Sequence, residues 1–162
     1  MVTAQAQRDS LDAADGDSTF HRLILDALDQ LDDPVVIFDK NWCYLFVNKV
    51  GWEVLNRPKS EVLGNNVWEL LPQLKGSEYQ KAARQAMRTQ QNKQIEEYYP
   101  YAQQWYTTKF YPLPNALVAQ MKDITELKET RRINDQLHGS LAEAMEVYWS
   151  DENKKRRRQQ AS

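Results

Sequence analysis

The sequence predicts an α+β domain, in which five antiparallel strands form a sheet and several helices lie between the second and third strands. Two kinds of periodicity carry this prediction. Residues 116–122 alternate core-facing side chains such as Leu117 and Ala119 with outward-facing neighbours, which is the period of a strand. Residues 18–33 and 77–91 instead repeat apolar side chains at three and four positions, which is the period of an amphipathic helix.

The N-terminal region combines a polar arm with a helix. Residues 1–17 are small, polar and acidic without periodicity, which predicts a disordered arm. A helix is expected to begin at the N-cap Ser18 and to end before Pro34, because proline disfavours helical geometry in the residue before it. We expect the apolar side chains of this helix to mediate homodimerisation. This N-terminal stripe consists of Phe20, Ile24, Ala27, Leu28 and Leu31.

The first half of the sheet is expected to be a hairpin. Residues 35–38 and 44–47 are rich in β-branched and aromatic side chains, which favour strands over helix. Asn48 can cap the short helix that follows, and Pro58 and Gly64 mark the limits of a second one. These brief helices are predicted to connect the two halves of the sheet.

The second half begins with a longer helix capped by Ser77, in which Tyr79, Ala82, Ala83, Ala86 and Met87 share a face and Lys81, Arg84 and Arg88 stay in solvent. Three strands are then expected at residues 93–99, 104–111 and 116–122. The last two strands are joined by a proline-rich turn.

A final helix follows the last strand without a loop. Asp123 is predicted to be its N-cap, and Glu126 completes a capping box. The helix is expected to run to about Trp149, and its heptad pattern is weak. The predicted organisation is an arm at 1–17, an amphipathic helix at 18–33, a core at 34–125, a C-terminal helix at 126–150 and a basic tail at 151–162.

Composition places the chain among ordinary globular proteins. It has 162 residues, 41% of them hydrophobic, and a net charge of −2 that indicates no particular partner. The single cysteine, Cys43, cannot form an internal disulfide. The first residues lack the apolar core of a signal peptide and no apolar run approaches a membrane span, so we expect a cytoplasmic protein without a transmembrane segment.

Four stretches of the chain together resemble a known family. They are PVVIFDKNWCYLFVN, RPKSEVLGNNVWELLP, WYTTKFYPLPNALVAQMKDIT and the Asp123-Ile124-Thr125 junction that ends the third stretch. Their order and spacing, over roughly residues 20–130, resemble a PAS domain of the kind found as input modules in bacterial sensor kinases and diguanylate cyclases. The resemblance implies a PAS-like five-stranded antiparallel sheet with a helical connector, flanked by N- and C-terminal helices.

Two turns depart from the pattern of the family. The first hairpin has Trp42, and the last hairpin has Ala116, where PAS domains usually carry glycine. We therefore expect Asn41 and Asn115 to adopt any left-handed conformation that these turns need, because asparagine tolerates it better than most residues.

The residues offer little for catalysis. The two histidines, His21 and His138, lie on predicted helices outside the core, and no glycine-rich phosphate loop is present. His138 lacks the sequence context of a kinase phosphoacceptor. We expect no enzymatic activity and no catalytic or metal-binding residues, although the chain can be the input piece of a histidine kinase or a diguanylate cyclase.

The resemblance also guides the search for cofactors. A flavin photoadduct needs a cysteine in the connector helices, where this chain has LGNNVWEL. Haem needs an axial ligand, and the long helix offers only Met87 and Tyr79. The sequence thus favours neither, and leaves a small apolar ligand, a non-covalent flavin or no ligand. The candidates to line an internal pocket are Phe46, Trp52, Trp68, Met87 and Met121, unless they simply fill the core.

Three functional hypotheses follow. The first is a non-enzymatic sensory or protein-interaction module of two-component-type signal transduction, which acts on a sensor kinase or other signalling partner. In this hypothesis a change in the core passes through a signal junction, Asp123, Ile124, Thr125 and Glu126, to the C-terminal helix. The second is a haem- or flavin-bearing sensor of redox state, gas or light. The third is a nucleic-acid-binding regulator that uses the basic residues Lys154 to Arg158, for which one short run is a weak signal.

Overall fold

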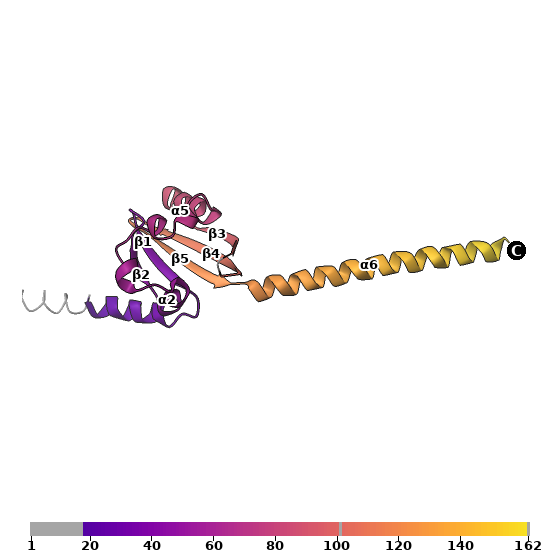
Figure 1. Ribbon diagram of the computed structural model, residues 1–162, viewed down its shortest axis with the longest axis horizontal. Coiled ribbons are helices and arrows are strands. Elements are labelled where there is room, and N and C mark those ends of the chain that lie inside the picture. The colour runs from indigo at the N-terminus through magenta and orange to yellow at the C-terminus, as the bar shows by residue number, and fades with distance from the viewer. Residues whose placement is uncertain (1–17, 101, 162) are drawn as a thin grey trace, which may run out of the picture. The chain divides into compact units, whose positions relative to one another are not determined.

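Five antiparallel strands form one sheet, with the strand order β2-β1-β5-β4-β3 (Figure 1). The computed structural model describes residues 18–100 and 102–161, and the predicted disordered arm at 1–17 lies outside them. The chain divides between Asp123 and Ile124 into two compact units. The strands are β1 (Val35–Asp39), β2 (Tyr44–Val47), β3 (Lys93–Tyr99), β4 (Gln104–Leu113) and β5 (Ala116–Asp123).

The strand register fixes which side chains face the core. On the buried face, Phe38 of β1 lies beside Leu117 of β5, and Phe110 of β4 lies beside Ala119 of β5. All four side chains are buried, because alternate residues of a strand point to the same face. The α+β architecture and all five predicted strands are confirmed, with boundaries that differ by no more than two residues.

The hairpin between β1 and β2 is held by Asp39. Its carboxylate accepts hydrogen bonds from the backbone N–H groups of Asn41 (2.8 Å) and Cys43 (2.9 Å). The same turn gives Trp42 a φ of 67°. The prediction that Asn41 takes the left-handed position is therefore wrong. The carboxylate fixes Asn41 inside the turn, and the following residue makes the return to the strand.

The closing hairpin needs no left-handed residue at the predicted position. Among the described residues, the positive φ values of non-glycine residues occur at Trp42, Asn56, Gln90 and Gln103. Asn115 is not one of them, so the prediction for this turn is also wrong. A two-residue turn at Pro114 and Asn115 joins the strands instead.

The connector consists of α2 (Lys49–Leu55), α3 (Lys59–Val62), α4 (Val67–Leu70) and the 3₁₀ helix η1 (Pro72–Leu74). Asn48 caps α2 as predicted, and its Oδ1 atom accepts from the backbone N–H of Gly51 and of Val35, both at 2.9 Å. Its Nδ2 atom donates to the carbonyl oxygens of Leu28 (3.1 Å) and Asp33 (2.9 Å). One fully buried amide thus joins the start of α2, strand β1 and the segment before it.

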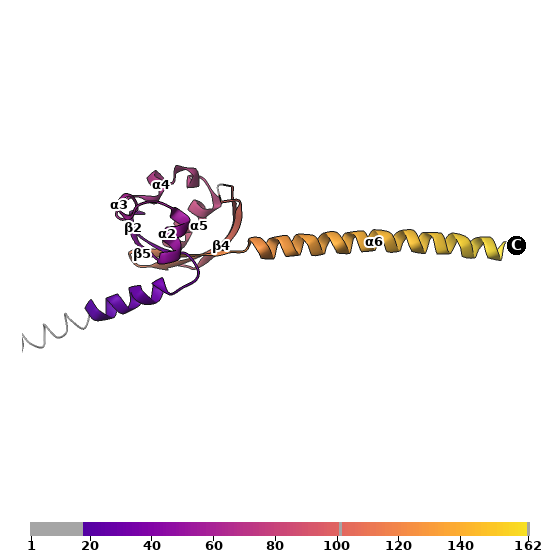
Figure 2. The same ribbon diagram turned by 60° about the horizontal axis from the view of Figure 1, so that its bottom comes forward.

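Helix α5 (Glu78–Thr89) follows, and the connector helices and α5 lie over one face of the sheet (Figure 2). Ser77 caps α5 as predicted, because its Oγ atom accepts from the backbone N–H of Gln80 at 3.2 Å. The predicted apolar face of α5 packs on the sheet, and the predicted basic side chains stay exposed.

The N-terminal helix ends earlier than predicted. Among the described residues, 18–29 are helical, and a turn follows at Gln30. Its last turn is anchored by the contact of Asn48 with Leu28 and by a 2.8 Å hydrogen bond from the Lys49 backbone N–H to Asp29 Oδ1. In the N-terminal stripe, Leu28 is half-buried and the other four side chains are exposed.

The second unit contains helix α6 (Thr125–Gln160), a helix of 36 residues without a buried side chain. Its N-cap is Ile124, so the prediction that Asp123 caps this helix in a box with Glu126 is wrong by one residue. Strand pairing of Asp123 with Tyr106 keeps it in β5. The helix also continues through residues 151–160, which were predicted to be a tail. Within the described residues, no helix combines the length and the apolar character needed to span a membrane.

Candidate functional site

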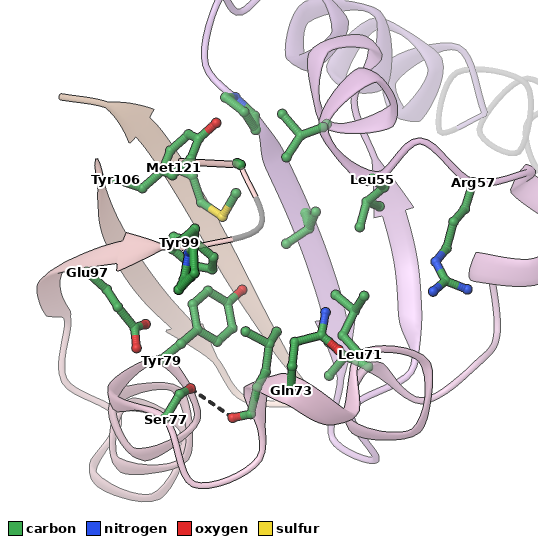
Figure 3. A pocket seen from close by; sticks show the side chains of 18 of the residues that line it. Leu55, Arg57, Leu71, Gln73, Ser77, Tyr79, Glu97, Tyr99, Tyr106 and Met121 are labelled. Atoms are coloured by element: carbon green, nitrogen blue, oxygen red, sulfur yellow. Dashed lines mark hydrogen bonds between the residues drawn. The ribbon is translucent and has the colours of Figure 1, made fainter. Parts of the chain in front are cut away.

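A cavity of about 400 Å³ lies between the sheet and the connector helices (Figure 3). Its volume falls within the range of roughly 300–1,000 Å³ that is common for small-molecule sites. The wall combines apolar side chains with tyrosines and a few polar groups. The lining includes Val36, Tyr44, Val54, Leu55, Arg57, Val67, Leu71, Gln73, Leu74, Ser77, Tyr79, Glu97, Tyr99, Tyr106 and Met121.

The sheet supplies one side of the cavity from three neighbouring strands. Glu97 and Tyr99 of β3 lie on one face because they are two residues apart, and Glu97 pairs with Tyr106 of β4. Met121 of β5 pairs with Thr108 of β4. The ends of these strands thus bring a carboxylate, two phenols and a thioether to one place.

The helices supply the other side. Leu55 ends α2, Leu71 precedes η1, and Tyr79 belongs to the first turn of α5. Figure 3 shows Tyr79, Tyr99 and Met121 converging from three elements, with Leu55 and Leu71 across from them. The middle of the cavity is therefore apolar.

Three tyrosines of the lining are held in their neutral form. Burial raises the pKa of Tyr79 well above its ordinary value, and the nearby phenols of Tyr99 and Tyr44 raise it further. Burial also raises the pKa of Tyr44, partly offset by the Arg57 guanidinium, and that of Tyr99, with a further contribution from the Glu97 carboxylate. Each tyrosine is a hydroxyl donor at neutral pH.

Glu97 is the acidic group of the site. Burial raises the pKa of Glu97 above its ordinary value, although the backbone N–H groups of Tyr79 and Glu78 at the start of α5 act to lower it. These N–H groups are among those that the first turn of a helix leaves without a partner inside the helix. Glu97 therefore takes a position where an anion is partly, but not fully, compensated.

Two polar atoms of the lining are buried without a hydrogen bond, the hydroxyl oxygen of Tyr99 and Oε2 of Glu97. The Thr108 hydroxyl lies close enough to lower the pKa of Tyr99, but its geometry does not make it a hydrogen-bond partner. By contrast, Tyr106 donates to Gln104 Oε1 at 2.9 Å, and Gln104 Nε2 donates to Asp123 Oδ2 at 2.8 Å. Buried polar groups are nearly always paired, so the two unpaired atoms stand out.

Comparison with known protein families identifies the fold. Residues 28–129 match the family described as PAS fold, and this span is more than half of the chain. The chain belongs to the PAS family. No curated protein matches the sequence.

Solved PAS structures share this architecture at low sequence identity. The PAS domain of BvgS from Bordetella pertussis has a TM-score of 0.58 at 16% identity, over 75% of this chain and 98% of that chain. A sensory box sensor histidine kinase from Vibrio cholerae has a TM-score of 0.52 at 15% identity, over 70% and 98% of the two chains. An RNA-binding Light-Oxygen-Voltage receptor has a TM-score of 0.58 at 16% identity, over 75% and 37%. At these identities the likeness shows the fold.

The PAS cavity contains only one of the five residues predicted to line a pocket. Met121 lines it. Trp68 is buried elsewhere in the core, and Met87 packs against that core from α5. Phe46 and Trp52 line a separate, open hollow with Leu45, Leu63 and charged residues of both signs. Trp68 and Met87 therefore follow the alternative in which these residues fill the core, and Phe46 and Trp52 lie outside this cavity. Periodicity identifies apolar positions but not which of them face an unfilled space.

The most informative residues of the site were not predicted. Glu97 and Tyr99 lie in the strand KQIEEYY, whose polar alternation indicates a strand but not which face is buried. The available signal in the sequence is a carboxylate and a phenol two positions apart in one strand, a spacing that places both on the same face. Tyr79 was predicted to face the core, and it does so with 3% of its surface exposed.

Other reactive side chains lie away from this cavity. Partial burial, with the carboxylates of Asp39 and Glu69, raises the pKa of the Cys43 thiol, which disfavours a reactive thiolate. His21 and His138 are exposed on helices. Within residues 18–100 and 102–161, no cluster of three or more His, Cys, Asp or Glu side chains is placed to hold a metal ion.

Proposed function

We propose that this PAS domain is a non-enzymatic sensory module of signal transduction, in which occupation of the cavity by a small, largely apolar ligand alters β5 and thereby α6. The observation that carries the proposal is the position of Met121. It lines the cavity and lies three residues before Ile124, the N-cap of α6. The same strand therefore touches the cavity and leads into the helix without an intervening loop.

The proposed relay needs only a small change in the strand. A ligand that contacts Met121 biases the position of β5, and Asp123, Ile124, Thr125 and Glu126 carry that bias into the first turn of α6. A ligand can shift such an equilibrium only by its different affinity for the two arrangements. All four residues of the signal junction belong to the proposed relay, although the N-cap of α6 is Ile124 and not the predicted Asp123.

The test uses substitutions that fill the cavity in place of a ligand. Leu71→Trp and Leu55→Trp each add a ring at the cavity wall, and Leu113→Trp adds the same ring at an exposed position outside it. Hydrogen exchange of residues 125–150 is compared among the folded variants and the wild type. We expect a several-fold change in exchange for either cavity variant and none for Leu113→Trp. Unchanged exchange in both cavity variants would refute the relay.

We also propose that the domain acts as a homodimer through the N-terminal stripe, assisted by α6. Phe20 and Ile24 of the stripe are exposed, as are Leu137 and Leu141 of α6. Large apolar side chains gathered on a helix are typical of association surfaces. A second copy of the chain offers the same apolar stripe, as a symmetric dimer requires.

Sedimentation velocity tests the dimer. We expect the wild type to sediment as a dimer at micromolar concentrations and the double variant Phe20→Glu, Ile24→Glu to be a folded monomer. Leu113→Glu, at an exposed site of β4, is the control and is expected to remain dimeric. A wild type that sediments as a monomer at these concentrations would refute the dimer proposal.

A further inference from the structure

The polar groups of the cavity narrow the chemistry of its ligand. Tyr99 presents a buried hydroxyl oxygen without a hydrogen-bond partner, and Glu97 presents a buried, unpaired carboxylate oxygen. Both side chains belong to β3 and line the same cavity. Since unpaired buried polar atoms are rare in folded proteins, a molecule that pairs with both is the simplest explanation for their placement.

The two groups leave the same face of one strand. Residues two positions apart on a strand have Cα atoms about 7 Å apart, and their side chains leave the same face. The Glu97 carboxylate acts on the titration of Tyr99, which places the two groups within electrostatic reach of each other. Figure 3 shows both side chains on the sheet side of the cavity, near the Tyr79 ring.

Their hydrogen-bonding characters are complementary. The neutral Tyr99 hydroxyl offers a donor, and the Glu97 carboxylate offers only acceptors. A ligand hydroxyl group both accepts and donates, so it can pair with both at once. A carbonyl or ether oxygen can accept a hydrogen bond from Tyr99, but it has no hydrogen to donate to Glu97.

The charges of the wall argue against an ionic ligand. Glu97 repels an anion at the polar end, and Arg57, which also lines the cavity, repels a cation. The wall between them is formed by side chains such as Leu55, Leu71 and Met121. A charge of either sign would lose its hydration in this apolar space with only one partner of opposite sign.

We infer that the cavity binds a neutral molecule with an apolar body and one hydroxyl group, an alcohol or a phenol, whose hydroxyl accepts from Tyr99 and donates to Glu97. The inference rests on the proposed function in treating the cavity as a ligand site. It adds the chemical class of the ligand and the two atoms that select it.

Three small aromatic probes with the same body test the head group. 2-Naphthol carries a hydroxyl, naphthalene carries no polar group, and 2-naphthoate carries an anion. Binding to the full chain at neutral pH is measured by isothermal titration calorimetry. We expect 2-naphthol to bind about tenfold more tightly than naphthalene, as one well-formed hydrogen-bond pair to a charged group permits. The anion is expected to bind most weakly.

Variants then test the two atoms. Tyr99→Phe and Glu97→Leu should each reduce the preference for 2-naphthol over naphthalene to less than about threefold while naphthalene binding is retained. Tyr111→Phe removes a hydroxyl from a β4 residue that does not line the cavity, and it should keep the wild-type preference. Circular dichroism confirms that each variant is folded.

The outcomes separate this inference from the proposed function. Equal binding of 2-naphthol and naphthalene, a preference that survives both cavity variants, or tightest binding of 2-naphthoate would each overturn the hydroxyl inference and leave the cavity as a ligand site. Failure of all three probes to bind would also overturn it. The hydrogen-exchange experiment on the Leu71→Trp variant decides the sensory relay independently, because it uses no ligand.

Discussion

The interior between the sheet and the helices has two ends that differ in packing. At one end Phe38, Phe110 and Leu117 fill the space almost without exposure, and Phe110 packs edge-on against Tyr79 with ring centroids 5.0 Å apart. At the other end the same strands continue to Met121 and Tyr106 and line a cavity of about 400 Å³. The strands run through both ends, and residues of α2 and η1 complete the wall of the cavity end.

The difference separates stability from recognition. At the filled end, close packing excludes water. At the cavity end, Glu97 and Tyr99 line the cavity and each keeps one buried polar atom without a partner. Trp68 Nε1 and Thr107 Oγ1 are also buried without a partner, but neither residue lines the cavity, so Glu97 and Tyr99 are the unpaired groups placed to contribute to binding.

The largest expected effect is a loss in the free energy of unfolding when a side chain is removed from the filled end, compared with a removal at the cavity end. Phe110→Ala removes a fully buried ring and should lower the free energy of unfolding by roughly 3–5 kcal/mol. Met121→Ala at the cavity wall should lower it by only about 1–2 kcal/mol, because that side chain is half-buried beside existing empty space. Urea unfolding measures both. Equal losses would mean that the cavity end is as tightly packed as the other.

Asn48→Ala tests the fully paired polar group. The substitution leaves the backbone N–H groups of Val35 and Gly51 buried without the partner they have now, and we expect a loss of roughly 2–4 kcal/mol. Asn65→Ala is the control, since its side chain makes one exposed hydrogen bond to the Glu61 carbonyl oxygen. A loss for Asn48→Ala no greater than for the control would contradict the assigned role.

For Tyr99→Phe we expect no loss in the free energy of unfolding, in contrast to Asn48→Ala. It removes a buried hydroxyl without a partner, so the free energy of unfolding should stay the same or rise by up to about 1 kcal/mol in the absence of ligand. Tyr106→Phe is the matched comparison, because its hydroxyl donates to Gln104 and its loss should be destabilising. Thermal unfolding of both variants gives the sign, and destabilisation by Tyr99→Phe would show that its hydroxyl is paired in solution.

The smallest effect is a pH dependence from Glu97. Burial raises the pKa of Glu97 in the folded protein above the ordinary 4.5. From pH 4.5 up to that higher pKa, the folded protein holds this proton and the unfolded chain releases it, so this group lowers the free energy of unfolding as pH rises. Glu97→Gln should therefore gain stability relative to the wild type across this interval. Urea midpoints at several pH values measure the gain, and the exposed Glu53→Gln should show none.

The sequence predicted most of the backbone because the relevant signals are local. Asn48 and Ser77 were recognised as caps because their side chains bond to backbone groups within three residues. Strand boundaries followed from alternation and from turn residues. Local reasoning failed where distant partners compete, as at Asp123, which strand pairing with Tyr106 keeps in β5 rather than at the cap.

The sequence by itself determined the PAS architecture, the caps of α2 and α5 and the apolar stripes of the helices, since periodicity and neighbouring residues suffice for these. Only the tertiary structure decided that Trp42 takes the left-handed turn position, that Phe46 and Trp52 stay out of the cavity and that Glu97 and Tyr99 both line it. An empty space depends on the side chains that surround it from several elements at once. No single segment of the sequence contains that information.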